Sequence, residues 1–91
     1  MRINIVRIDP QVALKIFNKH GLRSEEVEKT LMEGNPVYKK VGGSQYAAIG
    51  KTERFVTVFF TYEQKRKQAT ITTAYPSDKK QIRSYKKIRG R

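Results

Sequence analysis

The chain has 91 residues, the length of a single domain with one modest core, so we expect one domain spanning residues 1–91. It has no cysteine and one histidine, which excludes a disulfide framework, a thiolate metal site and a multi-histidine metal cluster; we expect neither metal nor cofactor. No apolar run approaches the roughly 18 residues of a membrane span, and the alternating N-terminal residues are unlike a signal peptide. We therefore expect a cytoplasmic protein without a membrane partner.

The positive charge lies almost entirely in the second part of the chain. The formal net charge is +12. Residues 1–35 hold six basic and five acidic side chains, a net of +1, whereas residues 36–91 hold fourteen basic and three acidic ones, a net of +11. A surface that serves solubility alone normally mixes both signs. Charge of one sign instead attracts polyanions, which indicates a nucleic acid and, less well, an anionic membrane surface.

Two helices are expected near the N-terminus. The first eight residues alternate as a short strand or an extended arm. Asp9 and Pro10 have the pattern of a helix start, and an apolar stripe that includes Phe17 follows at helical spacing. Ser24 is the expected N-cap of a second helix, which ends at residues 34–36. These patterns predict two helices before residue 36.

After residue 36 the apolar period changes from that of a helix to that of a strand. The predicted strands are Val37–Val41, Gln45–Ile49, Arg54–Tyr62 and Ala69–Tyr75. Their connections are so short that neighbours must be antiparallel. Residues 54–60 are apolar on both faces, which favours a central position in the sheet. The sequence thus predicts an α+β fold with an antiparallel meander of about four strands.

A basic helix is expected at the C-terminus, with Ser77 as its N-cap. Ile82, Tyr85 and Ile88 are spaced to form a narrow buried stripe. Seven cations cover the rest of the segment: Lys79, Lys80, Arg83, Lys86, Lys87, Arg89 and Arg91. A charge run usually marks a solvated face, but like charges without a counter-charge repel one another. We therefore expect an anion to bind there.

Metal-free RNA cleavage needs a base for the 2′-hydroxyl proton, cations for the phosphorane and an acid for the leaving oxygen. His20 is the natural proton carrier, although a histidine at a helix end also caps carbonyl groups. Lys51 and Arg54 flank a turn, where they either hold the scissile phosphate or are ordinary exposed charges. Thr73 and Tyr75 share a strand face and could donate hydroxyl hydrogens, but Tyr75 is equally well explained as a core aromatic.

The remaining candidates contact the RNA backbone. Lys65 and Arg66 lie in a charged turn, where phosphate contact and plain solubility are both reasonable, and Lys79, Lys80 and Arg83 begin the basic helix. No pair of carboxylates has the pattern of a glycosidase or a two-metal nuclease.

The order of several short motifs resembles BrnT-type toxins of bacterial toxin–antitoxin systems. The matching segments, which together cover roughly residues 9–87, are Lys-His-Gly at 19–21, Ser-Glu-Glu at 24–26, Tyr-Ala-Ala-Ile-Gly-Lys-Thr at 46–52, Ile-Thr-Thr-Ala at 71–74 and the basic helix ending in Tyr85. The resemblance implies a RelE-like fold within the barnase, EndoU, colicin and RelE group. It also implies metal-independent endoribonuclease activity and a cognate antitoxin, often of the ribbon-helix-helix type.

The chain departs from the family pattern at two positions. Gln45 and Tyr75 stand where the family usually has arginine. Delivered toxin domains of the wider group tend to use His, Lys, Thr and Tyr, which correspond here to His20, Lys51, Thr73 and Tyr75. The leading hypothesis is an endoribonuclease toxin with these four residues and Arg54 at its site. The alternative is a non-catalytic nucleic-acid-binding module on the same fold.

Overall fold

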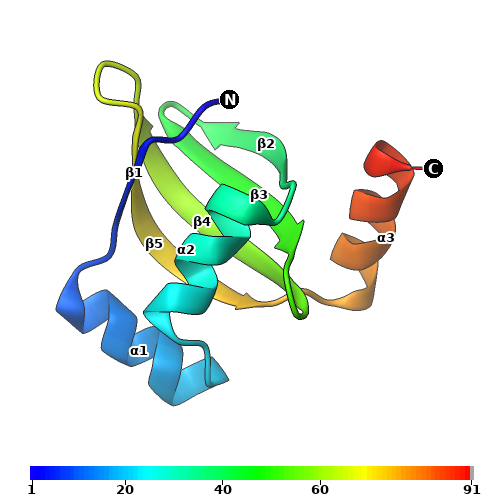
Figure 1. The fold of residues 1–91 in the computed structure, drawn as a ribbon, viewed down its shortest axis with the longest axis horizontal. Coiled ribbons are helices and arrows are strands. Elements are labelled where there is room, and N and C mark those ends of the chain that lie inside the picture. The colour runs from blue at the N-terminus through cyan, green and yellow to red at the C-terminus, as the bar shows by residue number, and fades with distance from the viewer. Residues whose placement is uncertain (91) are drawn as a thin grey trace.

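The computed structural model describes residues 1–90 as a five-stranded sheet with three helices (Figure 1). The elements follow the order β1 (Ile5–Arg7), α1 (Pro10–His20), α2 (Ser24–Glu33), β2 (Val37–Gly42), β3 (Gln45–Lys51), β4 (Phe55–Glu63), β5 (Gln68–Pro76) and α3 (Lys79–Arg89). Strands β2 to β5 form the expected antiparallel meander, with β4 in its interior. The α+β prediction is confirmed.

The N-terminal segment, which the sequence left open between a strand and an arm, is a fifth strand. β1 pairs in parallel with β5, and Ile5 aligns with Gln68 and Arg7 with Thr70. The sheet order is therefore β1-β5-β4-β3-β2. Because β1 covers only the first third of β5, the rest of that strand is left to contact α1.

The core lies between one face of the sheet and helices α1 and α2. Ala48, Val58 and Ala74 are aligned across β3, β4 and β5 and are fully buried. Ile16 of α1 and Val27 and Leu31 of α2 complete this layer. Phe17 was expected on the buried stripe of α1, but that prediction is wrong, because its side chain is 48% exposed.

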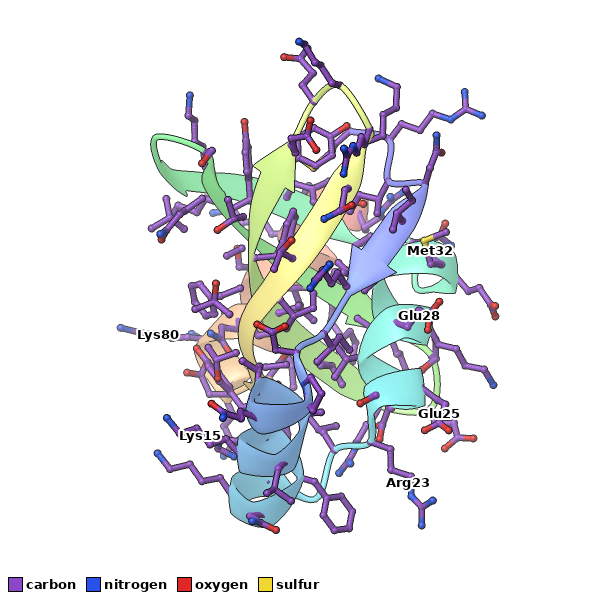
Figure 2. All side chains as sticks on the ribbon, turned by 90° about the vertical axis from the view of Figure 1, so that its left-hand side faces the viewer. Lys15, Arg23, Glu25, Glu28, Met32 and Lys80 are labelled. Atoms are coloured by element: carbon purple, nitrogen blue, oxygen red, sulfur yellow. The ribbon has the colours of Figure 1, made fainter. Side chains whose placement is uncertain are left out.

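Helix α3 stands on the other side of the sheet from α2, as the labelled Lys80, Glu28 and Met32 show in Figure 2. The buried stripe expected on α3 is wrong: none of its residues is buried, and Ile88 is 63% exposed. Its tertiary contacts are made by a few side chains along its length: Gln81 near its start, Tyr85 at its middle, where the ring packs against Phe55, and Arg89 at its end. None of the helices within residues 1–90 has the length and apolar character needed to cross a bilayer.

Two of the expected helix caps are wrong by one residue. Arg23, not Ser24, is the N-cap of α2. Asp78, not Ser77, is the N-cap of α3, where its carboxylate accepts a hydrogen bond from the Gln81 amide and the Gln81 side chain accepts one from the Asp78 amide. This reciprocal capping box satisfies two backbone donors, which a serine at 77 could not do with Gln81 four residues away.

Candidate active site on the open face of the sheet

The face of the sheet turned away from α2, called here the open face, is more polar than the core face, and the C-terminal end of α1 reaches it at β5. Thr57 aligns with Tyr75, and Phe59 aligns with Thr73, so these four side chains form a square across β4 and β5. Thr57 is buried, whereas the other three are half-buried. Two predicted site residues, Thr73 and Tyr75, therefore lie together on a partly accessible surface.

Gln81, at the start of α3, connects this surface to the helix. Its Oε1 accepts hydrogen bonds from the Thr57 hydroxyl at 2.9 Å and from the Asp78 amide at 2.9 Å. Its Nε2 donates to the Tyr75 hydroxyl oxygen at 3.0 Å. The Thr57 hydroxyl also lies 2.7 Å from that of Ser77. A buried threonine thus fixes the glutamine, and the glutamine in turn orients the tyrosine.

The bond from Gln81 has a chemical consequence for Tyr75. Because the phenol oxygen accepts a hydrogen bond from the Gln81 side-chain amide, its own O–H hydrogen is free to point toward another acceptor. The ring itself packs against Phe59, with 6.0 Å between the ring centroids. Tyr75 is therefore a positioned hydroxyl donor at the surface of the sheet.

His20 approaches the same tyrosine from the C-terminal end of α1. The two ring centroids are 5.8 Å apart and the rings are tilted by 49°. The helix stops at Gly21, whose φ of 70° is the left-handed conformation that glycine adopts readily, and its amide donates to the Phe17 carbonyl. His20 is exposed, and with Lys15, Lys19 and Thr73 it lines a small hollow of ≈ 230 Å³. The fold thus brings together His20, Thr73 and Tyr75, which are far apart in the sequence.

Lys51 and Arg54 make their contacts elsewhere within residues 1–90. The Lys51 ammonium nitrogen lies 5.2 Å from the centroid of the Phe55 ring, at the end of the β3–β4 pair. Arg54 reaches α2, where its Nε and Nη2 donate to the Glu26 carboxylate at 2.6 and 3.1 Å. The hydrogen bond to Glu26 raises the pKa of Arg54. Both cations are exposed, but neither contact leads to His20 or Tyr75.

The predicted backbone-binding cations fall into two separate groups. Lys79, Lys80 and Arg83 are exposed on α3, next to the end of β5. Lys65 and Arg66 lie in the turn between β4 and β5, where Arg66 is 4.0 Å from Glu63. The two groups are separated by the length of β5, about 25 Å at the rise of an antiparallel strand. Figure 1 shows the turn and α3 at opposite ends of the hairpin. Arg91, the last cation of the predicted basic helix, lies outside the described residues.

Sequence reasoning missed Gln81, Thr57 and Phe59. The pattern Asp78-x-x-Gln81 is a recognisable capping box and could have identified the glutamine, but as a helix start and not as a contact of Tyr75. Thr57 and Phe59 had no local signal, because alternation along an apolar strand does not reveal which face is covered.

No family model and no curated protein matches the sequence. Among solved structures, the crystal structure of the Brucella abortus ribonuclease toxin BrnT matches with a TM-score of 0.66 and covers 84% of this chain and 100% of its own. This chain has the BrnT fold. At 15% sequence identity the likeness concerns the fold, and it confirms the architecture implied by the short motifs.

Proposed function

We propose that this protein is a metal-independent endoribonuclease toxin that cleaves RNA at the open face of its sheet. The observation that carries the proposal is the packing of the only histidine against Tyr75, whose hydroxyl is oriented by Gln81. A proton carrier and a hydroxyl donor thus meet on a partly accessible surface, and α3 places cations next to it. The shared fold with a protein described as a ribonuclease toxin supports the same conclusion.

The chemistry is an attack of the ribose 2′-oxygen on the adjacent phosphorus. The 2′-hydroxyl loses its proton to a base, the 2′-oxygen forms a bond to phosphorus, and the bond to the 5′-oxygen breaks as that oxygen receives a proton. The products are a 2′,3′-cyclic phosphate and a free 5′-hydroxyl. In this proposal His20 acts as the acid or base, and Thr73 and Tyr75 donate hydrogen bonds to the phosphate oxygens.

The cations hold the RNA in this scheme. Lys51 and Arg54 are proposed to clamp the scissile phosphate, which requires Arg54 to exchange the Glu26 carboxylate for a phosphate. This exchange is chemically reasonable because a guanidinium binds both groups through the same paired geometry. Lys79, Lys80 and Arg83 on one side, and Lys65 and Arg66 on the other, are proposed to contact the flanking backbone.

The test is cleavage of bulk RNA by the purified protein in the presence of EDTA. The native chain should produce fragments that end in cyclic phosphate. His20→Ala should reduce the rate by at least about 100-fold, the typical contribution of a positioned acid or base, and Tyr75→Phe should reduce it by less. Asn18→Ala, an exposed change on the same helix, is the control and should cleave normally. Intact RNA with the native chain under all conditions, together with harmless expression in cells, would refute the proposal.

The partner in this proposal is a cognate antitoxin, of the ribbon-helix-helix type if the system follows the family pattern. Coexpression with the product of the neighbouring gene should restore growth to cells that express the native chain. Growth arrest that this product does not relieve, while it also fails to copurify, would remove the antitoxin from the proposal.

One observation favours the second candidate, a nucleic-acid-binding module without catalysis. Two of the five proposed catalytic side chains make contacts away from His20, and Arg54 already has a carboxylate partner. Such a module would bind RNA with a steep salt dependence and leave it intact. The cleavage assay therefore separates the two candidates directly.

A further inference from the structure

A second and larger hollow lies beside the candidate site, between α3 and the open face of β2, β3 and β4. Its volume is ≈ 700 Å³, and its lining is mainly apolar. Ala47, Ile49 and Phe59 line it from the floor formed by the sheet, and Gln81 lines it from α3. The hollow therefore shares Phe59 and Gln81 with the surroundings of Tyr75.

The hollow exists because of one small side chain and one lightly attached helix. Ala47 lies between Lys39 and Phe59 in the sheet register, and its methyl group leaves the space above it empty. Near its start, α3 is attached through Gln81. Around its middle, the Tyr85 hydroxyl donates to the Asn35 carbonyl at 3.1 Å, and at its end the Arg89 Nη2 donates to the Pro36 carbonyl at 3.4 Å. Since no residue of α3 is buried, the helix does not fill the space between itself and the sheet.

The apolar lining suits an aromatic part of a ligand, and the charged rim suits an anionic part of the same ligand. A half-exposed phenylalanine ring and aliphatic side chains suit a flat aromatic group. Lys39 and Lys80 also line the hollow, both are exposed, and they come from β2 and α3. These ammonium groups on two sides suit phosphates that flank the aromatic group.

We propose that this hollow is a nucleobase subsite for single-stranded RNA, in which one base stacks on Phe59 while Lys39 and Lys80 contact the neighbouring phosphates. The inference rests on the proposed function for its choice of RNA over an acidic peptide, because the hollow shares a wall with Tyr75. Gln81 then has a positioning role: it borders the bound base and donates to the Tyr75 hydroxyl. The base seated here belongs to a nucleotide next to the one that reacts.

The experiment measures binding on an oligonucleotide that cannot be cleaved. A short single strand with 2′-O-methyl sugars and one 2-aminopurine serves as the probe, because stacking quenches the fluorescence of that base. The native chain should bind it with strong quenching. Phe59→Leu should bind about tenfold more weakly and lose the quenching, since stacking on an aromatic ring is lost. Phe59→Tyr, which keeps the aromatic face, should restore both.

Two further variants protect this result against a folding artefact. Ala47→Leu fills the floor of the hollow without removing any native contact, and it should weaken binding as Phe59→Leu does. Phe17→Leu makes the same chemical change at an exposed aromatic on α1, outside the hollow, and should bind like the native chain. Thermal unfolding of each variant verifies that it is folded.

The outcomes distinguish the subsite from the catalytic proposal. Native affinity and quenching in both Phe59→Leu and Ala47→Leu would overturn the subsite, even if the native chain cleaves RNA. Equal affinity for the same strand with an abasic position in place of 2-aminopurine would also overturn it, and would favour a protein segment as the occupant. Base-dependent binding by a chain that never cleaves RNA would support the subsite and refute the ribonuclease.

Discussion

Substitution of Gly50 by alanine should separate helix α2 from strand β3. A Cβ at this position would lie 2.9 Å from the Thr30 carbonyl oxygen and 3.0 Å from the Thr30 Cγ2, and 3.2 Å from the Gly34 carbonyl oxygen. Two of these atoms are backbone, so they cannot rotate away as a flexible side chain would. The next residue, Lys51, donates its amide to the Gly34 carbonyl at 3.0 Å, which is the bond that this separation would lengthen.

The size of the effect follows from two contributions. Forcing an extra methyl group into a well-packed contact costs about 1–3 kcal/mol. Weakening the hydrogen bond from Lys51 to Gly34 adds about 1 kcal/mol. We therefore expect Gly50→Ala to lower the free energy of unfolding by about 2–4 kcal/mol, a large part of the stability of a small domain.

Urea denaturation followed by circular dichroism measures this loss as a fall in the midpoint of about 2 M. Gly42→Ala is the matched control, because a Cβ there meets nothing within 4 Å, and it should change stability by less than about 0.5 kcal/mol. Equal midpoints for Gly50→Ala and Gly42→Ala would refute the close-approach explanation. A changed slope without a changed midpoint would also count against it, since the slope reports surface exposed on unfolding.

Three other predictions concern the attachment of α3, the cations of α3 and Tyr38. Thr57→Val, which removes the hydroxyl that holds Gln81 and Ser77, should cost about 1–2 kcal/mol and speed hydrogen exchange in α3; unchanged exchange there would contradict the anchoring role. Replacing Lys79, Lys80 and Arg83 together by glutamine should reduce, by about 2, the slope of the logarithm of the RNA-binding constant against the logarithm of salt concentration for a single strand. An unchanged slope would show that α3 does not contact phosphates. Burial, more than the neighbouring Tyr62, raises the pKa of Tyr38. The folded state then holds the phenol proton to higher pH than the unfolded state. The contribution of Tyr38 to stability is therefore fully present below about pH 10 and is lost as the pH rises through the folded pKa. Tyr38→Phe should lessen this alkaline loss in equilibrium unfolding, and an identical loss in both proteins would argue against it.

Local patterns in the sequence were enough to predict α1, α2 and the β2–β5 meander. Short connections impose antiparallel neighbours, and the change of period at residue 36 separates the helices from the strands. The pairing of β1 with β5 could not be predicted in this way. The pairing is parallel and joins residues far apart in the chain, so no local turn or residue spacing predicts it. The two misplaced caps had a different cause, since each serine lies directly beside the residue that the helix geometry selects.

The site was predictable in its residue types and not in its arrangement. His20 was identified because histidine is suited to proton transfer, but its approach to Tyr75 depends on how α1 packs beside β5. Arg54 shows the opposite case. No spacing in the sequence pairs Arg54 with Glu26 of α2, and only the fold shows that the two side chains meet. Charge at an exposed position indicates what a residue can bind, while the fold decides which groups compete for it.

The position of the core along the chain has a consequence for how the protein can change. Every buried hydrophobic side chain of the described residues lies between Ile3 and Ala74. Substitutions along the exposed surface of α3 can alter its affinity for polyanions at little cost in stability. The contribution of α3 to polyanion binding can therefore vary in evolution with little disturbance of the core.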